Sequence, residues 1–307
     1  MKFYIGIDLG GTNVRTLLVD EEGNVYSEVK DVTEREKGPD YVVSKICRQI
    51  DALDLSACGG INGVEGIGIG VPGPVDTVNG VMIMATNLPG FENYPICQKL
   101  ADRYNLPTFI DNDANVAGLA EALLGAGKGY PIVYYVTIST GIGGALIVDG
   151  KLVSGGRGHA GEIGNIIVKN NGYKFGTLNP GAIEAEGSGT AITRKGKELL
   201  GDGAVSHAGN VFELAANGNT IAQGIVDEVV SQLATMFADI AHIVDPYCFI
   251  IGGGVMKSKK YFFANLEEQF NQKIHVGMRG HIQLLATELE DCGAIGAAML
   301  PMSRLAK

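Results

Sequence analysis

Two short glycine-rich motifs have the composition of phosphate-binding turns. They are Asp8-Leu9-Gly10-Gly11-Thr12-Asn13 and Ser139-Thr140-Gly141-Ile142-Gly143-Gly144. Each lies between two segments with a β-strand pattern, so its glycines can turn the chain tightly and bring backbone N–H groups against an anion. One such motif alone is equally compatible with a hairpin turn capped by Asp. Two of them in one chain favour phosphate binding.

A third glycine cluster, Gly252-Gly253-Gly254, follows the apolar run Cys248 to Ile251. It could let the flat face of a nucleoside approach the backbone, although a strand-to-helix turn has the same pattern. Asp8, at the end of the first predicted strand, could orient a magnesium ion through water. These features together indicate a nucleotide site.

Two other nucleotide-binding folds are excluded. The chain has no G-x-x-x-x-G-K-[ST] sequence, which excludes a P-loop enzyme. Residues 68–73 formally match G-x-G-x-x-G, but Pro72 and Pro74 prevent the helix that a Rossmann fold would begin there.

A cluster of carboxylates and amides could supply the chemistry of phosphoryl transfer. Asp111-Asn112-Asp113-Ala114-Asn115 follows a short predicted strand and precedes an apolar helix expected over 116–124. Either carboxylate could simply cap that helix. Phosphoryl transfer needs a positioned hydroxyl, a base within hydrogen-bond reach and neutralised phosphate charge. One carboxylate of this cluster would suffice as the base.

The elements that position these motifs form an α/β pattern. Alternating apolar residues predict a meander of three strands over 3–8, 14–20 and 25–32, then a helix through Val42 to Leu53 and a buried strand over 66–71. A helix over 96–104 and a strand over 107–110 follow, and strands over 132–138 and 145–149 begin a similar series, which suggests a weak internal duplication. A long helix is expected over 221–244 and a short one over 293–300. We therefore predict two lobes around a central cleft, 1–118 with the C-terminal helix 293–307, and 119–292.

Composition narrows the class of protein. The chain of 307 residues is 46% hydrophobic, long enough for two domains, and has 34 Asp and Glu against 24 Lys and Arg, which disfavours nucleic acid and anionic membranes as partners. Its five cysteines are scattered without C-x-x-C spacing, which argues against a disulfide framework. Its apolar stretches are short or broken by charged residues, so we expect a cytoplasmic protein.

These motifs, in this order, resemble those of the ROK family of bacterial sugar kinases and repressors, a branch of the actin and hexokinase superfamily. DLGGTN and STGIGGAL resemble its phosphate motifs, IIGGGV its adenosine motif, and GVPGPV and DNDAN its sugar-side motifs. The resemblance runs from end to end. It implies an actin-like (ribonuclease H-like) fold, ATP and magnesium as cofactors, a hexose or N-acetylhexosamine as substrate, and a homodimer.

The same resemblance assigns roles to individual residues. Asp113 would be the catalytic base. The residues implied to contact the sugar are Gly73, Asn87, Asn112, Asp113, Glu162, Asn165 and Glu184. Those implied to bind ATP or its phosphates are Asp8, Gly10, Gly11, Thr12, Asn13, Thr140, Gly141, Gly143, Gly252, Gly253 and Gly254. For Asn87 an ordinary Asx turn remains an alternative.

One segment departs from the family pattern. Relatives carry three cysteines that join a His to bind structural zinc, whereas Phe175, Thr177 and Ala182 stand at the cysteine positions and Asn165 at the His position. We therefore expect no structural zinc.

Without the metal, this loop needs another support. We expect packing of Phe175, Leu178 and Ile183 and the stiffness of Pro180 to hold it. Glu184 keeps the position of a sugar-contacting Glu in the family, and Glu186 is either a solvated neighbour or its substitute.

The predicted activity is ATP-dependent phosphorylation, at O6, of glucose or a related hexose or N-acetylhexosamine such as N-acetylmannosamine. One alternative is a sugar-responsive ROK transcriptional regulator; those carry an N-terminal helix-turn-helix, whereas this chain enters its first strand at Phe3. Another is a chaperone-like ATPase, for which the set Asn112, Asp113, Glu162 and Glu184 would have no purpose. Which sugar is the substrate stays open.

Overall fold

The structure is a computed structural model that describes residues 1–85 and 87–305. The chain divides into two compact units. Unit 1 contains Met1–Pro131, Ala145–Ala160 and Glu288–Lys307, and unit 2 contains Ile132–Gly144 and Gly161–Thr287. The lobes expected from the sequence, 1–118 with 293–307 and 119–292, stay a prediction; residues 306 and 307 lie outside the described residues.

The sheet of unit 1 has five strands in the order β3-β2-β1-β4-β7. They are β1 (Phe3–Leu9), β2 (Asn13–Asp20), β3 (Val25–Val32), β4 (Val64–Val71) and β7 (Thr108–Asn112). The first three form the predicted antiparallel meander, and β4 and β7 continue the sheet in parallel. Nearly every residue of β1 and β4 is buried, as expected for strands covered on both faces.

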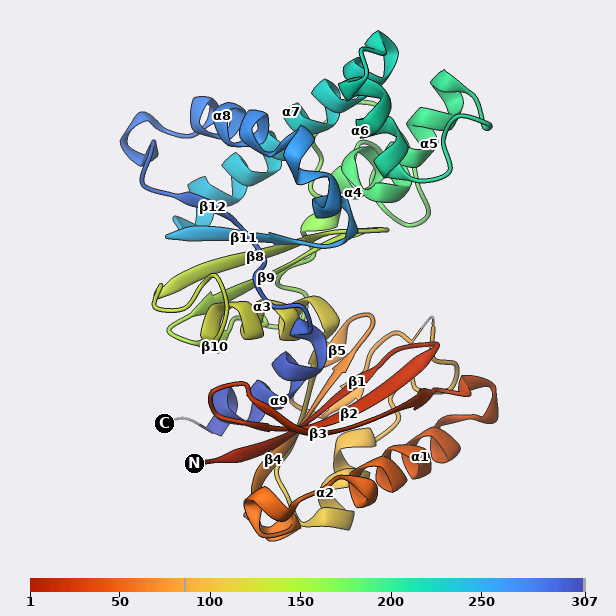
Figure 1. The fold of residues 1–307 in the computed structure, drawn as a ribbon, viewed down its shortest axis with the longest axis vertical. Helices are drawn as coiled ribbons and strands as arrows, with labels where there is room; N and C mark the ends of the chain where they lie inside the picture. The colour runs from red at the N-terminus through yellow and green to blue at the C-terminus, as the bar shows by residue number, and fades with distance from the viewer. Residues whose placement is uncertain (86, 306–307) are drawn as a thin grey trace. The chain divides into compact units, whose positions relative to one another are not determined.

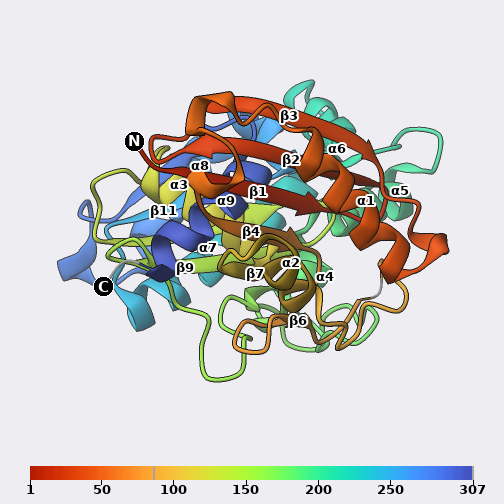
Figure 2. The same ribbon diagram turned by 90° about the horizontal axis from the view of Figure 1, so that it is seen from below.

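Helices cover both faces of this sheet (Figures 1 and 2). On one face lie α1 (Pro39–Ala52) and α2 (Ile96–Tyr104), and on the other α9 (Cys292–Leu305), against which α3 (Asp113–Leu123) packs. Smaller elements are β5 (Val75–Asp76), β6 (Val81–Met82), and the 3-10 turns η1 (Arg35–Lys37), η2 (Ser56–Cys58) and η3 (Ile61–Gly63).

The last helix approaches the sheet unusually closely. A side chain at Gly6 would lie 2.1 Å from the Ala294 carbonyl oxygen, and one at Gly68 would lie 1.8 Å from that of Ala297. The residue pattern predicted this helix over 293–300 and the lobe assignment gave it as 293–307; α9 begins at Cys292 and continues through Pro301 to Leu305, so the shorter bound is wrong. Proline has no N–H to donate to the carbonyl four residues earlier. The carbonyl four residues before Pro301 is that of Ala297, so it receives no hydrogen bond from residue 301, and it packs against Gly68.

The second sheet has the order β10-β9-β8-β11-β12. Its strands are β8 (Ile132–Ile138), β9 (Ile142–Val148), β10 (Lys151–Leu152), β11 (Cys248–Gly252) and β12 (Gln283–Ala286). In both sheets the chain passes through three consecutive strands and then adds two parallel ones, β4 and β7 in the first and β11 and β12 in the second. The predicted internal duplication is therefore confirmed at the level of sheet topology.

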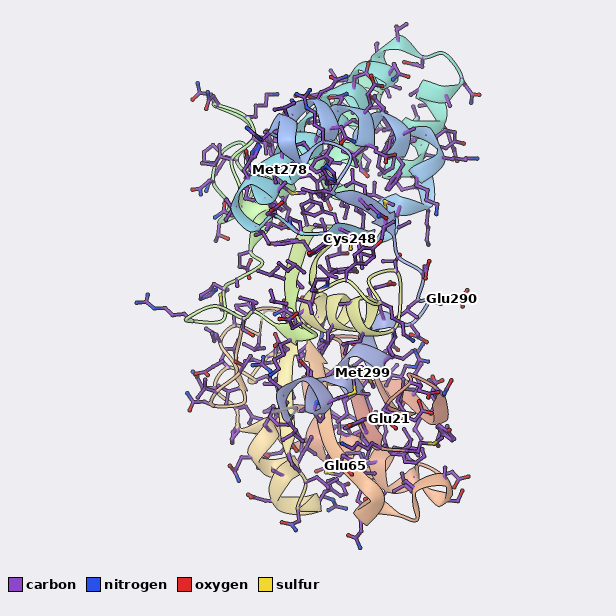
Figure 3. All side chains as sticks on the ribbon, turned by 90° about the vertical axis from the view of Figure 1, so that its left-hand side faces the viewer. Glu21, Glu65, Cys248, Met278, Glu290 and Met299 are labelled. Carbon is purple, nitrogen blue, oxygen red and sulfur yellow. The ribbon has the colours of Figure 1, made fainter. Side chains whose placement is uncertain are left out.

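Most helices of unit 2 were absent from the prediction. The helices that were not predicted are α4 (Ile183–Gly187), α5 (Gly189–Leu200), α6 (Ala208–Ala216) and α8 (Phe263–Lys273). The long helix α7 (Thr220–Val244) was predicted. The 3-10 segments of unit 2 are η4 (Ile163–Asn165), η5 (Gly254–Tyr261) and η6 (Val276–Met278). Phe237 of α7, Phe249 of β11 and Phe270 of α8 pack edge to face in the core. Figure 3 labels the neighbouring Cys248 and, in unit 1, Met299 of α9, both fully buried. Among the described residues, every helix is too short or too polar to cross a bilayer.

Candidate functional sites

The first glycine motif forms a tight turn between β1 and β2. The Gly10 N–H donates to the Asn13 carbonyl at 2.9 Å, and the buried Thr33 hydroxyl donates to the Gly10 carbonyl at 2.6 Å. Within the described residues, the amides of Gly11 and Thr12 have no hydrogen-bond partner. The turn therefore presents two free N–H groups, the arrangement that binds an anion.

Asn87 and Arg35 lie against this turn. A side chain at Gly11 would lie 2.8 Å from both the Asn87 carbonyl oxygen and Arg35 Nη1. The same Arg35 nitrogen donates to the Asn87 carbonyl at 2.9 Å, and the Asn87 side chain is exposed. Sequence reasoning did not include Arg35, because it belongs to none of the motifs; only the fold brings it to the turn.

The carboxylates of Asp8 and Asp113 are within electrostatic reach of each other. Burial raises the pKa of Asp8, the negative charges of Asp113 and Asp291 raise it further, and Arg15 opposes this shift. Burial also raises the pKa of Asp113, against the effect of the Ala114 N–H, which donates to its Oδ1 at 2.8 Å. Asp113 is exposed at the surface, although many protein atoms surround its carboxylate. A raised pKa suits a carboxylate that must accept a proton.

Asn112 caps α3 and ties it to Gly73. Its Oδ1 accepts from the Ala114 N–H at 2.8 Å, and its Nδ2 donates to the Gly73 carbonyl at 3.0 Å. Gly73 has φ 89°, and a side chain there would lie 2.9 Å from the Met84 carbonyl oxygen. Three predicted sugar-side residues, Gly73, Asn112 and Asp113, are thus brought together.

Asp111, the other carboxylate considered as a cap, has a different role. It is fully buried, accepts from Asn115 Nδ2 at 2.6 Å, and pairs with Arg304 at 2.9 Å. Both of its oxygens are occupied, so it serves the packing of α9 against β7.

In unit 2, the second and third glycine motifs meet. Gly253 has φ 93°, and a side chain there would lie 2.4 Å from the Ile138 carbonyl at the end of β8. A side chain at Gly254 would lie 3.5 Å from Ser139 Oγ. Thr140 and Gly141 form the turn itself, whereas Gly143 lies within β9. The backbone of the third motif thus approaches the second turn closely.

A pocket of about 920 Å³ opens beside these two motifs within unit 2. Its wall combines the glycine motifs with α5, α6 and η5. The lining residues are Ser139, Thr140, Gly189, Thr190, Thr193, Arg194, Lys197, Glu198, Ser206, His207, Ala208, Gly209, Glu213, Gly254, Val255, Lys257, Ser258, Lys260 and Tyr261.

Several basic side chains reach this pocket. Among the described residues, Lys197 and Lys257 form no ion pair, so their charges remain available to an anion. The pocket also includes the first turn of α5, where Ser188 caps the helix by accepting from the Ala191 N–H at 3.2 Å. Sequence reasoning found the glycines but none of the helical residues, since no short motif carries them.

Glu184 is tied to the second glycine turn. Its Oε2 accepts from the Ile142 N–H at 2.8 Å, and a side chain at Gly141 would lie 2.5 Å from that oxygen. Asn165 Oδ1 accepts from the Asn179 N–H at 2.7 Å, and Glu162 is exposed at the start of η4. Their contacts with a sugar stay a prediction.

The loop at residues 166–182 is held differently from the prediction. Phe175 was expected to pin it, but its side chain is 48% exposed, and Leu178 is only half-buried; Ile183 alone of the three is fully buried. Glu186 was expected to be solvated or to replace Glu184, but it is 1% exposed and pairs with Lys195 at 3.1 Å. The expectation is therefore wrong for Phe175 and confirmed for the burial of Ile183, and the expectation for Glu186 is wrong, because this carboxylate is buried and holds the loop by polar contacts.

The residues in this loop do not fit structural zinc. The aligned positions, Asn165, Phe175, Thr177 and Ala182, present no thiolate or imidazole, the ligands that zinc prefers. Within residues 1–85 and 87–305, no three His, Cys, Asp or Glu side chains gather as a metal site would need. Asp8 and Asp113, by contrast, offer the carboxylate oxygens that suit magnesium held partly through water.

The two sheets of matching strand order define an α/β protein of the actin-like class. A ROK hexokinase from Thermus thermophilus has the same fold, with a TM-score of 0.85, 30% identity and 97% of each chain covered. A ROK family glucokinase from Streptomyces griseus, solved with glucose and AMPPNP, has a TM-score of 0.75 at 30% identity, covering 99% of this chain and all of that one. The predicted fold class is confirmed.

The ROK family model matches residues 4–304, so the chain belongs to the ROK family. It is 34% identical to a glucokinase of Thermotoga maritima, over 98% of both chains. It is 29% identical to an N-acetylmannosamine kinase of Escherichia coli, over 96% of this chain and 97% of that one. The resemblance drawn from the motifs is thereby confirmed: the chain is similar throughout to sugar kinases of the family.

Proposed function

We propose that this protein is an ATP- and magnesium-dependent hexose kinase that phosphorylates O6 of glucose or a related hexose or N-acetylhexosamine. The observation that carries the proposal is that Asp8 at the end of β1 and Asp113 just after β7 lie at the same edge of one sheet, beside a glycine turn whose Gly11 and Thr12 amides have no partner among the described residues. Phosphoryl transfer needs a base for the hydroxyl and donors for the phosphates, and these residues supply both.

Asp113 takes the proton of the acceptor hydroxyl. Its pKa, raised by burial, makes it a stronger base than an ordinary carboxylate. Asn112 and Gly73, joined by their 3.0 Å hydrogen bond, and the exposed Asn87 side chain orient the sugar beside it. Magnesium, when bound, neutralises phosphate charge, and Asp8 is the residue that would hold it through water.

The pocket of unit 2 binds the nucleotide. Its volume of about 920 Å³ suits a nucleotide, the close backbone of Gly253 and Gly254 gives a flat surface for the nucleoside, and Lys197 and Lys257 provide positive charge. The AMPPNP and glucose bound by the Streptomyces griseus relative support a ternary complex of this kind.

The relatives support two sugar classes. The Thermotoga maritima protein is a glucokinase at 34% identity to this chain, and the Escherichia coli protein is an N-acetylmannosamine kinase at 29% identity. We favour glucose because both the relative with 34% identity and the glucose-bound structure are glucokinases.

A coupled ADP-release screen over glucose, N-acetylmannosamine, N-acetylglucosamine, allose and fructose tests the proposal. We expect one of these sugars to give magnesium-dependent turnover and a 6-phosphate product, identified by phosphorus NMR. Saturable sugar binding without ADP release from any of them would overturn the kinase assignment and favour a sugar-sensing role.

A further inference from the structure

The loop at residues 166–182 is closed at its base by backbone contacts. The Val168 N–H donates to the Gly181 carbonyl at 2.9 Å, and the Gly181 N–H donates to the Tyr173 carbonyl at 3.1 Å. Gly181 has φ 76°, and a side chain there would lie 1.8 Å from the Lys169 carbonyl oxygen. The two arms of the loop therefore lie too close together for any residue other than glycine at 181.

A buried carboxylate holds the middle of this loop. Glu186 Oε1 accepts from the Tyr173 N–H at 2.6 Å, and Oε2 lies 3.1 Å from Lys195 Nζ. Lys195 is itself only 7% exposed. Two buried charges are tolerated only when they are paired and hydrogen-bonded, so this geometry is strongly constrained. The Tyr173 amide of the loop thus hydrogen-bonds to the Glu186 side of the Glu186–Lys195 pair.

The pair extends into a network that joins the loop to three helices. Lys195 Nζ also lies 3.1 Å from Glu228 Oε2 on α7, and Lys169 Nζ at the start of the loop lies 2.7 Å from Glu228 Oε1. Arg194 of α5 stacks on the Tyr173 ring at 3.6 Å. We call Glu186, Lys195, Glu228 and Lys169 the Glu186 network. It connects α4, α5 and α7, which lie together in Figure 1, with Lys169 and the Tyr173 amide of the loop.

We propose that the Glu186 network is a positioning device that replaces a structural metal and fixes Glu184 for sugar binding. The proposal rests on the proposed function. Glu184 and Glu186 belong to the same five-residue helix, α4, so whatever holds Glu186 also sets the place of Glu184. Glu184 keeps Oε2 on the Ile142 N–H, which leaves Oε1 for a hydroxyl.

The network should affect the sugar more than the nucleotide. The second glycine turn has supports of its own, because the Ser139 N–H donates to the Gly141 carbonyl at 2.8 Å and the Gly189 N–H donates to the Ser139 carbonyl at 2.7 Å. Asn165, by contrast, is bound to the loop through the Asn179 N–H. Loosening the loop therefore releases the sugar-side residues Glu184 and Asn165 while the turn persists.

The test compares Glu186→Gln, Lys195→Met and the double variant. Glu186→Gln keeps an acceptor for the Tyr173 N–H but removes the charge that faces Lys195. We expect the KM for the sugar to rise about tenfold, the KM for ATP to change less than about twofold, and trypsin to cut faster after Lys169 or Lys174. In Glu186→Gln the buried Lys195 keeps, among the described residues, only Glu228 as a charged partner, whereas the double variant removes this buried charge and leaves Glu228 paired with Lys169. The double variant should therefore recover at least half of the lost sugar affinity on a logarithmic scale.

Asp51→Asn is the matched control. It breaks the exposed 2.6 Å ion pair with Arg103 in unit 1 and should leave the loop and both KM values unchanged. Three results would each overturn the proposal. The first is a folded Glu186→Gln variant whose loop is cut at the wild-type rate, and the second is an equal rise in the KM values for sugar and ATP. The third is a double variant that recovers no sugar affinity. If Glu186→Gln does not fold, Lys169→Met at the exposed end of the network must still speed tryptic cleavage after Lys174, the site in the loop that this variant keeps. Loop proteolysis without ligands tests the network even if the wild-type chain phosphorylates no sugar, so the two failures are distinguishable.

Discussion

Replacing Asp113 with Asn is the most direct test of the chemistry. The amide cannot accept the hydroxyl proton, and removing a general base costs about two to four orders of magnitude in rate. We therefore expect kcat to fall about 10²- to 10⁴-fold, which is about 2.7 to 5.4 kcal/mol at about 1.36 kcal/mol per tenfold change. Sugar binding should largely survive, because Asn112 and Gly73 keep their contact at 3.0 Å.

The structure indicates that this variant folds. The Ala114 N–H is already bonded to Asn112 Oδ1 at 2.8 Å, and the new side chain at position 113 keeps an oxygen toward the same amide. The free energy of unfolding should therefore change by no more than about 1 kcal/mol.

The sign of the stability change follows from the pKa of Asp113. Because burial raises this pKa in the folded state, the folded protein holds a proton that the unfolded chain has already lost, and stability falls as pH rises through that interval. The uncharged amide of the Asp113→Asn variant has no such penalty. The variant should be at least as stable as the wild type at neutral pH, and the difference should disappear as the pH falls through the folded and then the unfolded pKa.

Coupled ADP release gives kcat, titration calorimetry gives sugar affinity, and thermal unfolding at several pH values gives stability. Asp149→Asn, at an exposed turn with φ 49° that Asn tolerates, is the control and should leave all three unchanged. In the wild type, kcat/KM should fall as the pH is lowered, and the midpoint of this fall should lie at a pH above the ordinary pKa range of carboxyl groups. Calorimetric sugar binding with near-normal turnover in the Asp113→Asn variant would refute the assignment of the base.

Three further predictions rest on the same contacts. Gly11→Val should abolish ATP use and weaken sugar binding, because its Cβ would lie 2.8 Å from the Asn87 carbonyl; an unchanged KM for ATP in the folded variant contradicts this. Arg35→Met should raise the KM for the sugar about three- to tenfold through loss of the 2.9 Å bond to Asn87, with partial recovery in Arg35→Lys; unaltered kinetics would exclude a role for Arg35. Activity should survive a zinc-selective chelator at excess magnesium, and elemental analysis should find substoichiometric zinc; one tightly bound, essential zinc per chain would show that the loop is misread.

Local sequence signals predicted much of the fold. The alternation in residues 25–32 and the helical spacing in 96–104 give the bounds of β3 and α2 as they stand in the structure. The glycine motifs could be found for the same reason, because a turn that brings backbone N–H groups together is encoded by adjacent residues. Residues of one motif, such as Asn112 and Asp113, were therefore identified together.

Contacts between distant residues could not be predicted in this way. Arg35 reaches Asn87 across 52 positions of the chain, and Lys195 reaches Glu228 across 33. The aromatic Phe175 was expected to hold the loop by apolar packing, although the buried partner of the loop is the charged Glu186. A buried carboxylate is recognisable only when its ammonium partner is known, and in Lys195 that partner lies on another helix.

The close contact of α9 with the first sheet has a consequence for biosynthesis. Residues 288–305 leave the ribosome after all of unit 2. Their Ala294 and Ala297 carbonyls nevertheless pack directly against Gly6 and Gly68, which leave the ribosome before unit 2 begins. Until then β1, which carries Asp8, and β4 lack the helix α9 that covers one face of their sheet. During translation, unit 2 has all of its segments available before unit 1 does, so the sheet that is begun first is the one completed last.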